Sequence, residues 1–394
     1  MTKPLRVLSV CPGTLGYLDS YVSGTTLCYM TMGKNHGAHT TALCPARMWR
    51  ARGGKIYPPF ENHEHFQVIR KGDNDLRIEP EDYDYFLNQV TGRTFDIISD
   101  LNGTNREFTK ILQDTFQIPA VLTVEQAGCR AGLPLDICDQ YPPLTADWQS
   151  TIRQMSAVIT WHINDINRLS VIGGGVVPVW HVYFGLDIPS SVRHLAFQNK
   201  NKGRASYVGS IFADPDHWKK SAELAEVVPL ILEHTPVQEF YICGTCADSY
   251  AEPMINQLLL KYPGRVIYKD LKTDRESALR VIAESFFVYT PVGHNQIGCL
   301  PVEAWALRTP ILMTNSTYIK DRITGMRPDR LTDIPARIEE LYRSSELYRT
   351  IQDNGRRHYE AYFTPDAMAA SYYKIFSSVA DDWKQGISNR KEIA

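Results

Sequence analysis

Short apolar runs rich in β-branched residues alternate with longer amphipathic stretches along most of the chain, a pattern typical of buried strands and surface helices. The strands predicted in the first half are Leu5 to Cys11, His39 to Leu43, Phe95 to Asp100, Ala120 to Val124, Ala157 to Thr160 and Val176 to Trp180. Those predicted in the second half are Ala205 to Val208, Glu239 to Cys243, Arg265 to Tyr268, Phe286 to Thr290 and Ile311 to Met313. Several connections have the length of a helix, so the pattern predicts an α/β fold in which helices cover parallel sheets.

Helical spacing of apolar residues marks the other main elements. Apolar residues recur every three or four positions from His217 to Glu233, which predicts a helix. Beyond Met313 we expect helices over Pro335 to Tyr342 and over Glu346 to Phe363. A last helix is predicted to start at Thr364-Pro365-Asp366, because threonine is a common N-cap and proline suits the first helical position.

The length of the chain, 394 residues, predicts two domains, because single hydrophobic cores rarely grow beyond about 250 to 300 residues. A polar stretch without apolar periodicity, Ser190 to Arg204, is the predicted interdomain linker. We therefore expect an N-terminal domain over residues 1–190, a C-terminal domain over residues 203–363 and a helical segment over residues 364–394.

Composition narrows the class of protein. Hydrophobic residues make up 43% and charged residues 22% of the chain, and no apolar run approaches the length of a membrane span. The first apolar run, Val7 to Cys11, is too short for a signal peptide, so we expect a cytoplasmic protein. The net charge of −2 gives no overall indication of nucleic-acid binding.

Cysteines and histidines do not predict a metal site. The 8 cysteines are scattered, and most lie in apolar runs, which indicates reduced core residues rather than a disulfide framework. Cys243 and Cys246 form a C-x-x-C, but without a second pair we interpret it as a strand end followed by a glycine turn.

Loops after the predicted strands are the candidate ligand sites, because parallel α/β sheets bind ligands at the carboxyl ends of their strands. Gly13 and Gly16 follow the first strand and would allow a ligand, or another stretch of backbone, to approach closely. A plain glycine turn explains them equally well.

The most informative segment runs from Thr290 to Met313 and predicts a strand, a glycine-bearing loop, a short helix and another strand. A helix that begins near Leu300 would direct free N–H groups at the loop, as a diphosphate site requires. Glu303 would then be able to accept hydrogen bonds from ribose hydroxyls. Alternatively, Pro301 at the first helical position and Glu303 at the third would make an ordinary helix start.

This segment resembles the signature of retaining GT-B glycosyltransferases related to sucrose and glycogen synthases, the family 4-like group. The match comprises Gly298, Glu303-Ala304-Trp305-Ala306 and Thr309-Pro310. More thinly, Tyr207 to Ser210 resembles the opening of that family's donor domain, and Tyr241 to Gly244 resembles its third strand. Gly185-Leu186-Asp187 is similar to the exit from its acceptor domain.

The resemblance implies a GT-B fold with two facing Rossmann-like domains, an N-terminal acceptor domain and a C-terminal donor domain, and a last helix that returns to the first domain. It implies a nucleotide sugar, UDP- or GDP-linked, as co-substrate, with neither a metal nor another cofactor. The donor contacts that it implies are Gly13, Gly16, Gly209, Ser210, Lys219, Lys220, Gly244, Asp270, Leu271, His294, Asn295, Gly298, Cys299, Leu300 and Glu303.

Two departures from the family's pattern leave the donor open. Asn295 stands where the family has its first glutamate, and Ser210 stands where an arginine often follows the domain-opening glycine. Loss of that arginine removes one positive charge from the diphosphate site. Lys219 or Lys220 corresponds to the lysine that usually follows.

Two carboxylates are candidate general bases in the N-terminal domain. Glu125 follows the strand Ala120 to Val124, where the family commonly has a histidine, and Asp100 ends another predicted strand. Either carboxylate could take a proton from an acceptor hydroxyl. Alternatively each caps the following helix, so the stereochemical outcome stays open.

A patch of basic residues is a candidate contact for the acceptor. Arg47, Arg50 and Arg52 surround Trp49 in the loop after the second strand, a combination that can hold phosphates and stack a base. A solvated loop explains it as well. The patch keeps open a phosphorylated acceptor, an anionic membrane surface, or DNA as in phage-type transferases that modify hydroxylated bases.

Three other functions fit the same fold. A nucleotide-sugar epimerase would need no acceptor, and a non-catalytic binding subunit would bind the donor without turnover. A DNA-modifying transferase would differ in its acceptor. The sequence predicts neither the sugar nor the oligomeric state.

Overall fold

A computed structural model describes residues 4–10, 24–45, 63–72, 78–101, 105–124, 149–161, 163, 165–214, 221–270, 275–291, 298–314, 316 and 318–386. The chain forms two compact units. Unit 1 comprises Met1–Gly185 together with Thr364–Ala394, and unit 2 comprises Leu186–Phe363. The chain therefore passes between the units twice, after Gly185 and after Phe363.

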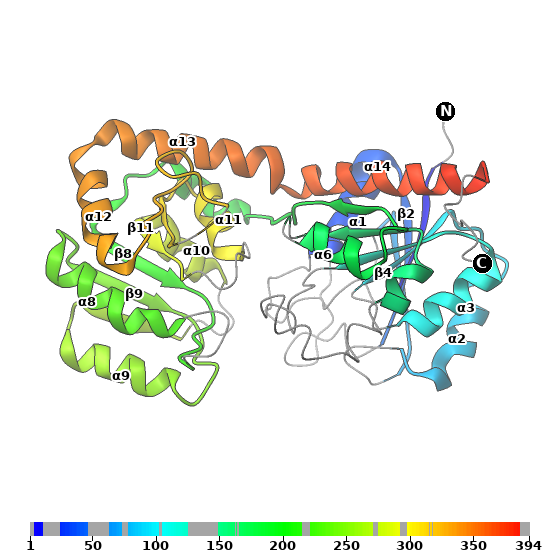
Figure 1. Cartoon of the computed structure of the whole chain (residues 1–394), viewed down its shortest axis with the longest axis horizontal. Coiled ribbons are helices and arrows are strands. Elements are labelled where there is room, and N and C mark those ends of the chain that lie inside the picture. Colours follow the sequence, from blue (N-terminus) through cyan, green and yellow to red (C-terminus); the bar gives the residue numbers. More distant parts are fainter. Residues whose placement is uncertain are drawn as a thin grey trace. The chain divides into compact units, whose positions relative to one another are not determined.

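Unit 1 contains a seven-stranded sheet in the order β3-β2-β1-β4-β5-β6-β7, and every neighbouring pair is parallel (Figure 1). Its strands are β1 (Arg6–Val10), β2 (His39–Cys44), β3 (Phe66–Arg70), β4 (Ile97–Leu101), β5 (Ala120–Val124), β6 (Ala157–Thr160) and β7 (Val179–His181). The sequence did not predict β3. Because β3 lies at the sheet's edge and its three apolar residues are interrupted by Gln67 and followed by Arg70, it lacks the continuous apolar run of a central strand.

The helices of unit 1 lie on both faces of this sheet. They are α1 (Gly24–His36), η3 (Pro80–Asp82), α2 (Tyr83–Val90), α3 (Arg106–Phe116), α6 (Asp165–Ile172) and α14 (Pro365–Lys384). The α14 helix starts as the sequence predicts, since the Thr364 side chain accepts a hydrogen bond from the backbone N–H of Ala367.

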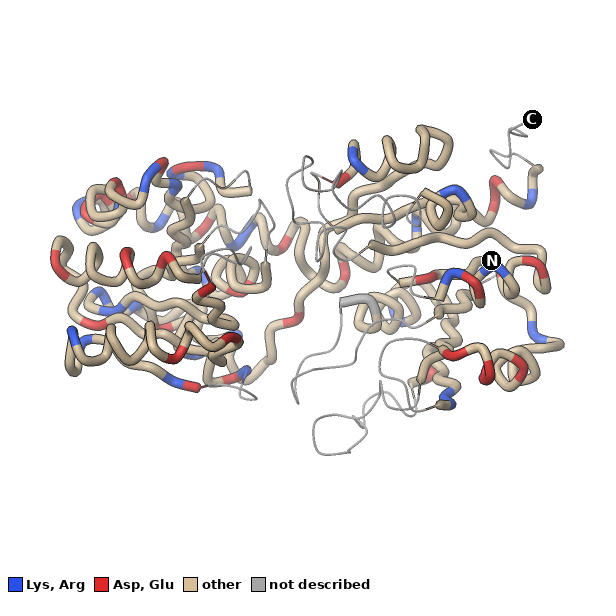
Figure 2. Tube along the Cα trace, turned by 60° about the horizontal axis from the view of Figure 1, so that its bottom comes forward, with Lys and Arg blue, Asp and Glu red and all other residues tan. Residues whose placement is uncertain are grey.

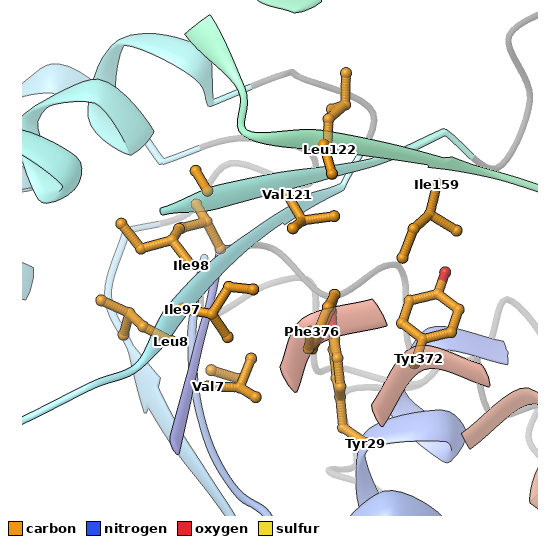
Figure 3. Close-up of a cluster of buried hydrophobic side chains, with 14 of the residues drawn as sticks. Val7, Leu8, Tyr29, Ile97, Ile98, Val121, Leu122, Ile159, Tyr372 and Phe376 are labelled. Atoms are coloured by element: carbon orange, nitrogen blue, oxygen red, sulfur yellow. The ribbon is translucent and has the colours of Figure 1, made fainter. Parts of the chain in front are cut away.

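The core of unit 1 explains why the last helix belongs to it. Tyr29 of α1 and Tyr372 and Phe376 of α14 are fully buried against one face of the sheet (Figure 3). Alternate strand residues, among them Val7, Ile97, Val121 and Ile159, point to that face, whereas Leu8, Ile98 and Leu122 point to the other.

Unit 2 contains a five-stranded parallel sheet in the order β10-β9-β8-β11-β12. Its strands are β8 (Asn201–Val208), β9 (Glu239–Cys243), β10 (Val266–Lys269), β11 (Ser285–Tyr289) and β12 (Ile311–Leu312). Its helices are α7 (Ser190–Arg193), η4 (His194–Phe197), η5 (Ser221–Glu223), α8 (Leu224–His234), α9 (Ala251–Lys261), α10 (Arg275–Glu284), α11 (Cys299–Ala306), η6 (Leu331–Asp333), α12 (Ile334–Arg343) and α13 (Ser345–Tyr362).

The polar stretch Ser190 to Arg204 is not a linker, and this part of the sequence interpretation is wrong. It forms α7, η4 and the start of β8, all within unit 2. Val192, Leu195 and Ala196 are buried despite their polar neighbours, which ties the segment to the unit. The predicted helix from His217 also differs, since α8 begins at Leu224 after η5, and residues 215–220 lie outside the described part of the chain.

Charged residues of both signs are interspersed along the helices of each unit (Figure 2). Several form pairs one helical turn apart, such as Arg280 with Glu276 and Arg356 with Glu360. Exposed pairs of this kind contribute little to stability, about 0.3 to 0.5 kcal/mol each. The ion pair between Arg275 and Glu303 differs from them because both of its side chains are buried.

Candidate active site

The carboxyl edge of the sheet in unit 2 brings together most of the predicted donor residues that the structure describes. All five strands are parallel, so their carboxyl ends meet at one edge. Gly209 and Ser210 follow β8, Gly244 follows β9 and Asp270 follows β10. Gly298 lies beyond β11, directly before α11.

Backbone hydrogen bonds close this edge. The N–H of Gly209 donates to the carbonyl of Cys243, and the N–H of Gly244 donates to the carbonyl of Lys269, each at 2.9 Å. Gly244 has a φ of +155°, and a Cβ atom there would lie 1.8 Å from the carbonyl oxygen of Gly209. Glycine at 244 is therefore a steric requirement of the closed edge.

Tyrosine hydroxyls donate hydrogen bonds to backbone carbonyls in the turns at this edge, and two polar side chains in the same turns are exposed. Tyr207 donates to the carbonyl of Ser210 at 2.8 Å, and Tyr268 donates to the carbonyl of Gly244 at 2.9 Å. The side chains of Ser210 and Asp270 are exposed. Both side chains are therefore accessible to solvent at this edge.

Helix α11 begins at Cys299, with Gly298 exposed as its N-cap and Leu300 buried. Pro301 is therefore the third helical residue and Glu303 the fifth, which contradicts the alternative that Pro301 opens the helix with Glu303 serving its first amides. The N-cap residue of α11 is a glycine, so the N-cap itself contributes no side-chain hydrogen bond to this N-terminus. Its N–H groups carry the positive end of the helix dipole.

Glu303 lies one turn inside α11 with only 8% of its surface exposed. Its Oε1 is 3.4 Å from Nε of Arg275, which is equally buried at 8% exposure. Burial raises the pKa of the Glu303 carboxyl, and the guanidinium of Arg275 opposes that increase. The result is a buried ion pair, not a helix cap.

Arg275 was not among the site residues predicted from the sequence. Its position in the chain gives one weak indication of a role: Arg275 is the first residue of α10, where the positive end of the helix dipole disfavours a cation. Such a position indicates a compensating partner elsewhere in the fold. That partner is 28 residues away in the sequence.

Asp100, one of the two candidate bases, lies in the sheet of unit 1. It is fully buried in β4, and its Oδ2 accepts a hydrogen bond from the Thr109 hydroxyl of α3 at 2.8 Å. The bond joins Asp100 to a side chain within α3, so it does not cap the first turn of that helix. Asp100 therefore contributes to the packing of α3 on the sheet.

The remaining candidates lie outside the described residues, so the structure says nothing of them. They are Gly13, Gly16, Arg47, Trp49, Arg50, Arg52, Glu125, Lys219, Lys220, Leu271, His294 and Asn295.

The C-x-x-C segment has the arrangement that the sequence predicts. Cys243 ends β9, Gly244 forms the turn, and Cys246 is half-buried with its Sγ 3.6 Å from the Tyr268 hydroxyl. Burial raises the pKa of the Cys243 thiol to about 11, so it stays protonated at neutral pH. Among the described residues, no group of three or more His, Cys, Asp or Glu is arranged to hold a metal ion.

Within the described part of the chain, no helix combines the length and apolarity needed to cross a membrane.

No family model matches the sequence, and no curated protein matches it. Solved structures do share its architecture. Sucrose-phosphate synthase from Thermosynechococcus elongatus superposes with a TM-score of 0.70 at 14% identity, covering 95% of this chain and 99% of that one. The chain has the GT-B fold.

Two further structures with this GT-B architecture widen the comparison. HepE of Anabaena in complex with UDP-glucose has a TM-score of 0.65 at 12% identity, covering 95% of this chain and 100% of that one. The N-terminal domain of trehalose-6-phosphate phosphatase from Candida albicans has a TM-score of 0.69 at 11% identity, covering 95% and 97%. At such identities the likeness establishes the fold, and the predicted fold class is confirmed.

The chain departs at one further position from the glycosyltransferase signature that the segment Gly298 to Pro310 resembles. Arg308 occupies the position where the family's pattern reads glycine before Thr309-Pro310, and its φ of +55° lies in the left-handed region. An ion pair with Asp353 and a hydrogen bond from Gln352 to the Arg308 carbonyl at 2.7 Å hold it there. A residue other than glycine thus adopts a left-handed backbone conformation at this position.

Proposed function

We propose that the chain is a glycosyltransferase that moves a sugar from a nucleoside diphosphate sugar to a hydroxyl acceptor. The observation that carries the proposal is the buried Glu303 one turn inside α11, a helix whose glycine-capped N-terminus lies at the carboxyl edge of a parallel sheet. A similar structure, HepE of Anabaena, contains UDP-glucose. The three features together favour donor binding over a plain structural helix start.

In this proposal each part of the edge meets one part of the donor. The first N–H groups of α11, after Gly298, would bind the diphosphate, since a helix N-terminus favours anions. Glu303 would accept hydrogen bonds from the ribose hydroxyls. Gly244 and the exposed Asp270 would border the base.

The predicted contacts outside the described residues belong to the same proposal. Lys219 or Lys220 would supply charge to the diphosphate, and His294 and Asn295 would contact sugar hydroxyls. Gly13, Gly16 and Leu271 would line the same donor. Of the two candidate bases the proposal keeps Glu125, because the Asp100 carboxylate is buried against α3.

A thermal-shift panel of UDP- and GDP-linked sugars tests the proposal. A donor at about 100 times its dissociation constant should stabilise the protein by about 2.7 kcal/mol. A hit with one nucleotide decides between UDP and GDP, and release of that nucleotide only when an acceptor is added indicates transfer. An altered sugar without acceptor would indicate an epimerase, and binding without turnover would indicate a binding subunit. No stabilisation by any member would contradict the proposal.

Glu303→Gln is the sharpest single substitution. It keeps the shape of the side chain but removes the charge, so donor affinity should fall at least tenfold, which corresponds to about 1.4 kcal/mol. Isothermal titration with the donor found in the panel measures this loss. Glu303→Ala is a poorer test, because it removes the whole carboxyl group, so Arg275 also loses the oxygen that accepts from its Nε. Glu284→Gln, at an exposed carboxylate that ends α10, is the matched control and should bind normally.

A further inference from the structure

The guanidinium of Arg275 joins two parts of unit 2. Its Nε lies 3.4 Å from Oε1 of Glu303, and its Nη2 donates to the backbone carbonyl of Asp187 at 2.6 Å. Asp187 is the second residue of unit 2 after the chain leaves unit 1. One buried side chain thus contacts both the donor-site carboxylate and the segment where the chain enters the unit.

That entry segment is held firmly enough to serve as an anchor. The Tyr359 hydroxyl donates to the carbonyl of Leu186 at 2.9 Å, and Arg193 Nε donates to the carbonyl of Ile188 at 2.6 Å. The N–H of Leu186 donates to the carbonyl of Phe363, the residue at which the chain leaves unit 2. Three successive carbonyls are therefore each bound by a side chain of unit 2, and Arg275 binds the middle one.

The position of Arg275 is unfavourable unless a specific partner compensates it. It is buried and lies at the first residue of α10, so both desolvation and the helix dipole disfavour its charge. The carboxylate of Asp187 pairs with Arg193 at 2.7 Å. Glu303 is the carboxylate that pairs with Arg275, and the two buried charges depend on each other.

We propose that Arg275 is a positioning residue for donor binding, which keeps Glu303 ionised and fixed while the Asp187 carbonyl fixes Arg275 itself. The inference rests on the proposed function, because it assigns Glu303 to the ribose. An ionised carboxylate has about four acceptor sites, so a contact with Arg275 leaves capacity for ribose hydroxyls. A protonated Glu303 would have fewer acceptor sites for the ribose hydroxyls.

The other charged groups around this pair do not titrate in the same way. On α13, burial raises the pKa of Tyr359 to about 12, so it stays neutral. His358 of α13 packs on Trp305 of α11, and burial lowers its pKa. Its titration is common to all the variants below, so differences between them report on Glu303.

The test is the affinity for UDP and for GDP between pH 5 and pH 9, measured by isothermal titration on the full chain. Arg275→Met should weaken binding about tenfold at pH 8. On acidification its affinity should fall at a higher pH than that of the wild type, because loss of the cation raises the pKa of Glu303 further. Arg275→Lys keeps the charge, so its pH midpoint should stay near that of the wild type. If Arg275→Met does not fold, Arg275→Gln carries the same expectation.

Two comparisons make the test specific. Arg280→Met removes an exposed arginine from the same helix, paired with Glu276, and should leave both affinity and pH profile unchanged. In the Glu303→Gln background, Arg275→Met should cause little further loss, because its action runs through Glu303. Additive losses, or an unchanged pH profile in a folded Arg275 variant, would overturn the inference while leaving the proposed function standing. A wild type that binds neither nucleotide would overturn both.

Discussion

The carboxyl edges of the two sheets differ in what their polar side chains contact. Backbone hydrogen bonds join strand ends in both: from Gly209 and Gly244 in unit 2, and from Trp161 to Val124 and Val182 to Thr160 in unit 1. In unit 1, however, polar side chains near the ends of two strands also contact helices: Asp100 of β4 contacts Thr109 of α3, and Thr123 of β5 contacts Tyr372 of α14.

The difference determines which side chains are available for a ligand. Ser210 and Asp270 are exposed at the edge in unit 2, whereas Asp100 and Thr123 in unit 1 are buried and engaged in packing. Polar residues at strand ends are thus equivalent in the sequence but not in the fold. Substitutions at the two edges should therefore change the free energy of unfolding by different amounts.

The largest effect is expected at Gly244. Gly244→Ala should lower the free energy of unfolding by more than about 3 kcal/mol, since the new methyl group collides with the Gly209 carbonyl and the backbone is strained at a φ of +155°. Denaturant titration measures the loss. Gly264→Ala is the control: its φ is +73° but nothing lies within 4 Å, so only about 1 kcal/mol of strain is expected. Equal losses would contradict steric closure of the edge.

Lys200 tests how much a side chain at the opposite edge of the sheet stabilises unit 2. Directly before β8, at the opposite edge of the sheet, its Nζ donates to the carbonyls of Ala283 and Leu307 at 2.6 and 2.8 Å. Lys200→Met should cost about 1–3 kcal/mol near pH 9, because two carbonyls lose their partner.

That cost should depend on pH with a definite sign. Burial lowers the pKa of Lys200 to about 7, against 10.5 for the free side chain. Between these values the unfolded state binds the extra proton, so wild-type stability gains from this group as pH rises from 7 towards 10. Urea unfolding at pH 6 and pH 9 should show a larger difference between wild type and Lys200→Met at pH 9. A difference that shrinks with pH would contradict the assignment.

Tyr372 tests the side-chain edge of unit 1. Its hydroxyl accepts from Trp161 Nε1 at 2.9 Å and donates to Thr123 Oγ1 at 3.4 Å, so α14 is bound to the ends of two strands. Tyr372→Phe should cost about 1–2 kcal/mol and increase hydrogen exchange in α14. Tyr373→Phe, at a half-buried ring stacked on His36, should change stability by less than about 0.5 kcal/mol.

The smallest effect is expected at Thr245. Its hydroxyl lies 3.4 Å from Oδ1 of the exposed Asp270, a side-chain contact at an edge that the backbone already closes. Thr245→Ala should change the free energy of unfolding by less than about 0.5 kcal/mol. A loss as large as that of Tyr372→Phe would remove the distinction between the two edges.

Local sequence patterns predicted much of the fold, because their physical causes are local. Buried strands such as Ala120–Val124 are short runs rich in β-branched residues, and Thr364 with Pro365 marks a helix start through capping and a fixed φ. The edge strand β3 was not predicted, since Gln67 and Arg70 interrupt its apolar residues. The break between the units escaped too, because buried Val192 and Leu195 stand among polar neighbours.

The sequence by itself determined the α/β class, most of the strands along the chain and the segment from Gly298 to Pro310, where glycine, a short helix and Glu303 follow one another. Only the tertiary structure decided that Glu303 pairs with Arg275, that Asp100 contacts Thr109 of α3, and that Tyr372 and Phe376 of α14 fill the core of unit 1. These features depend on which distant segments share a buried space. A buried charge or hydroxyl must find its partner there, and sequence spacing does not specify it.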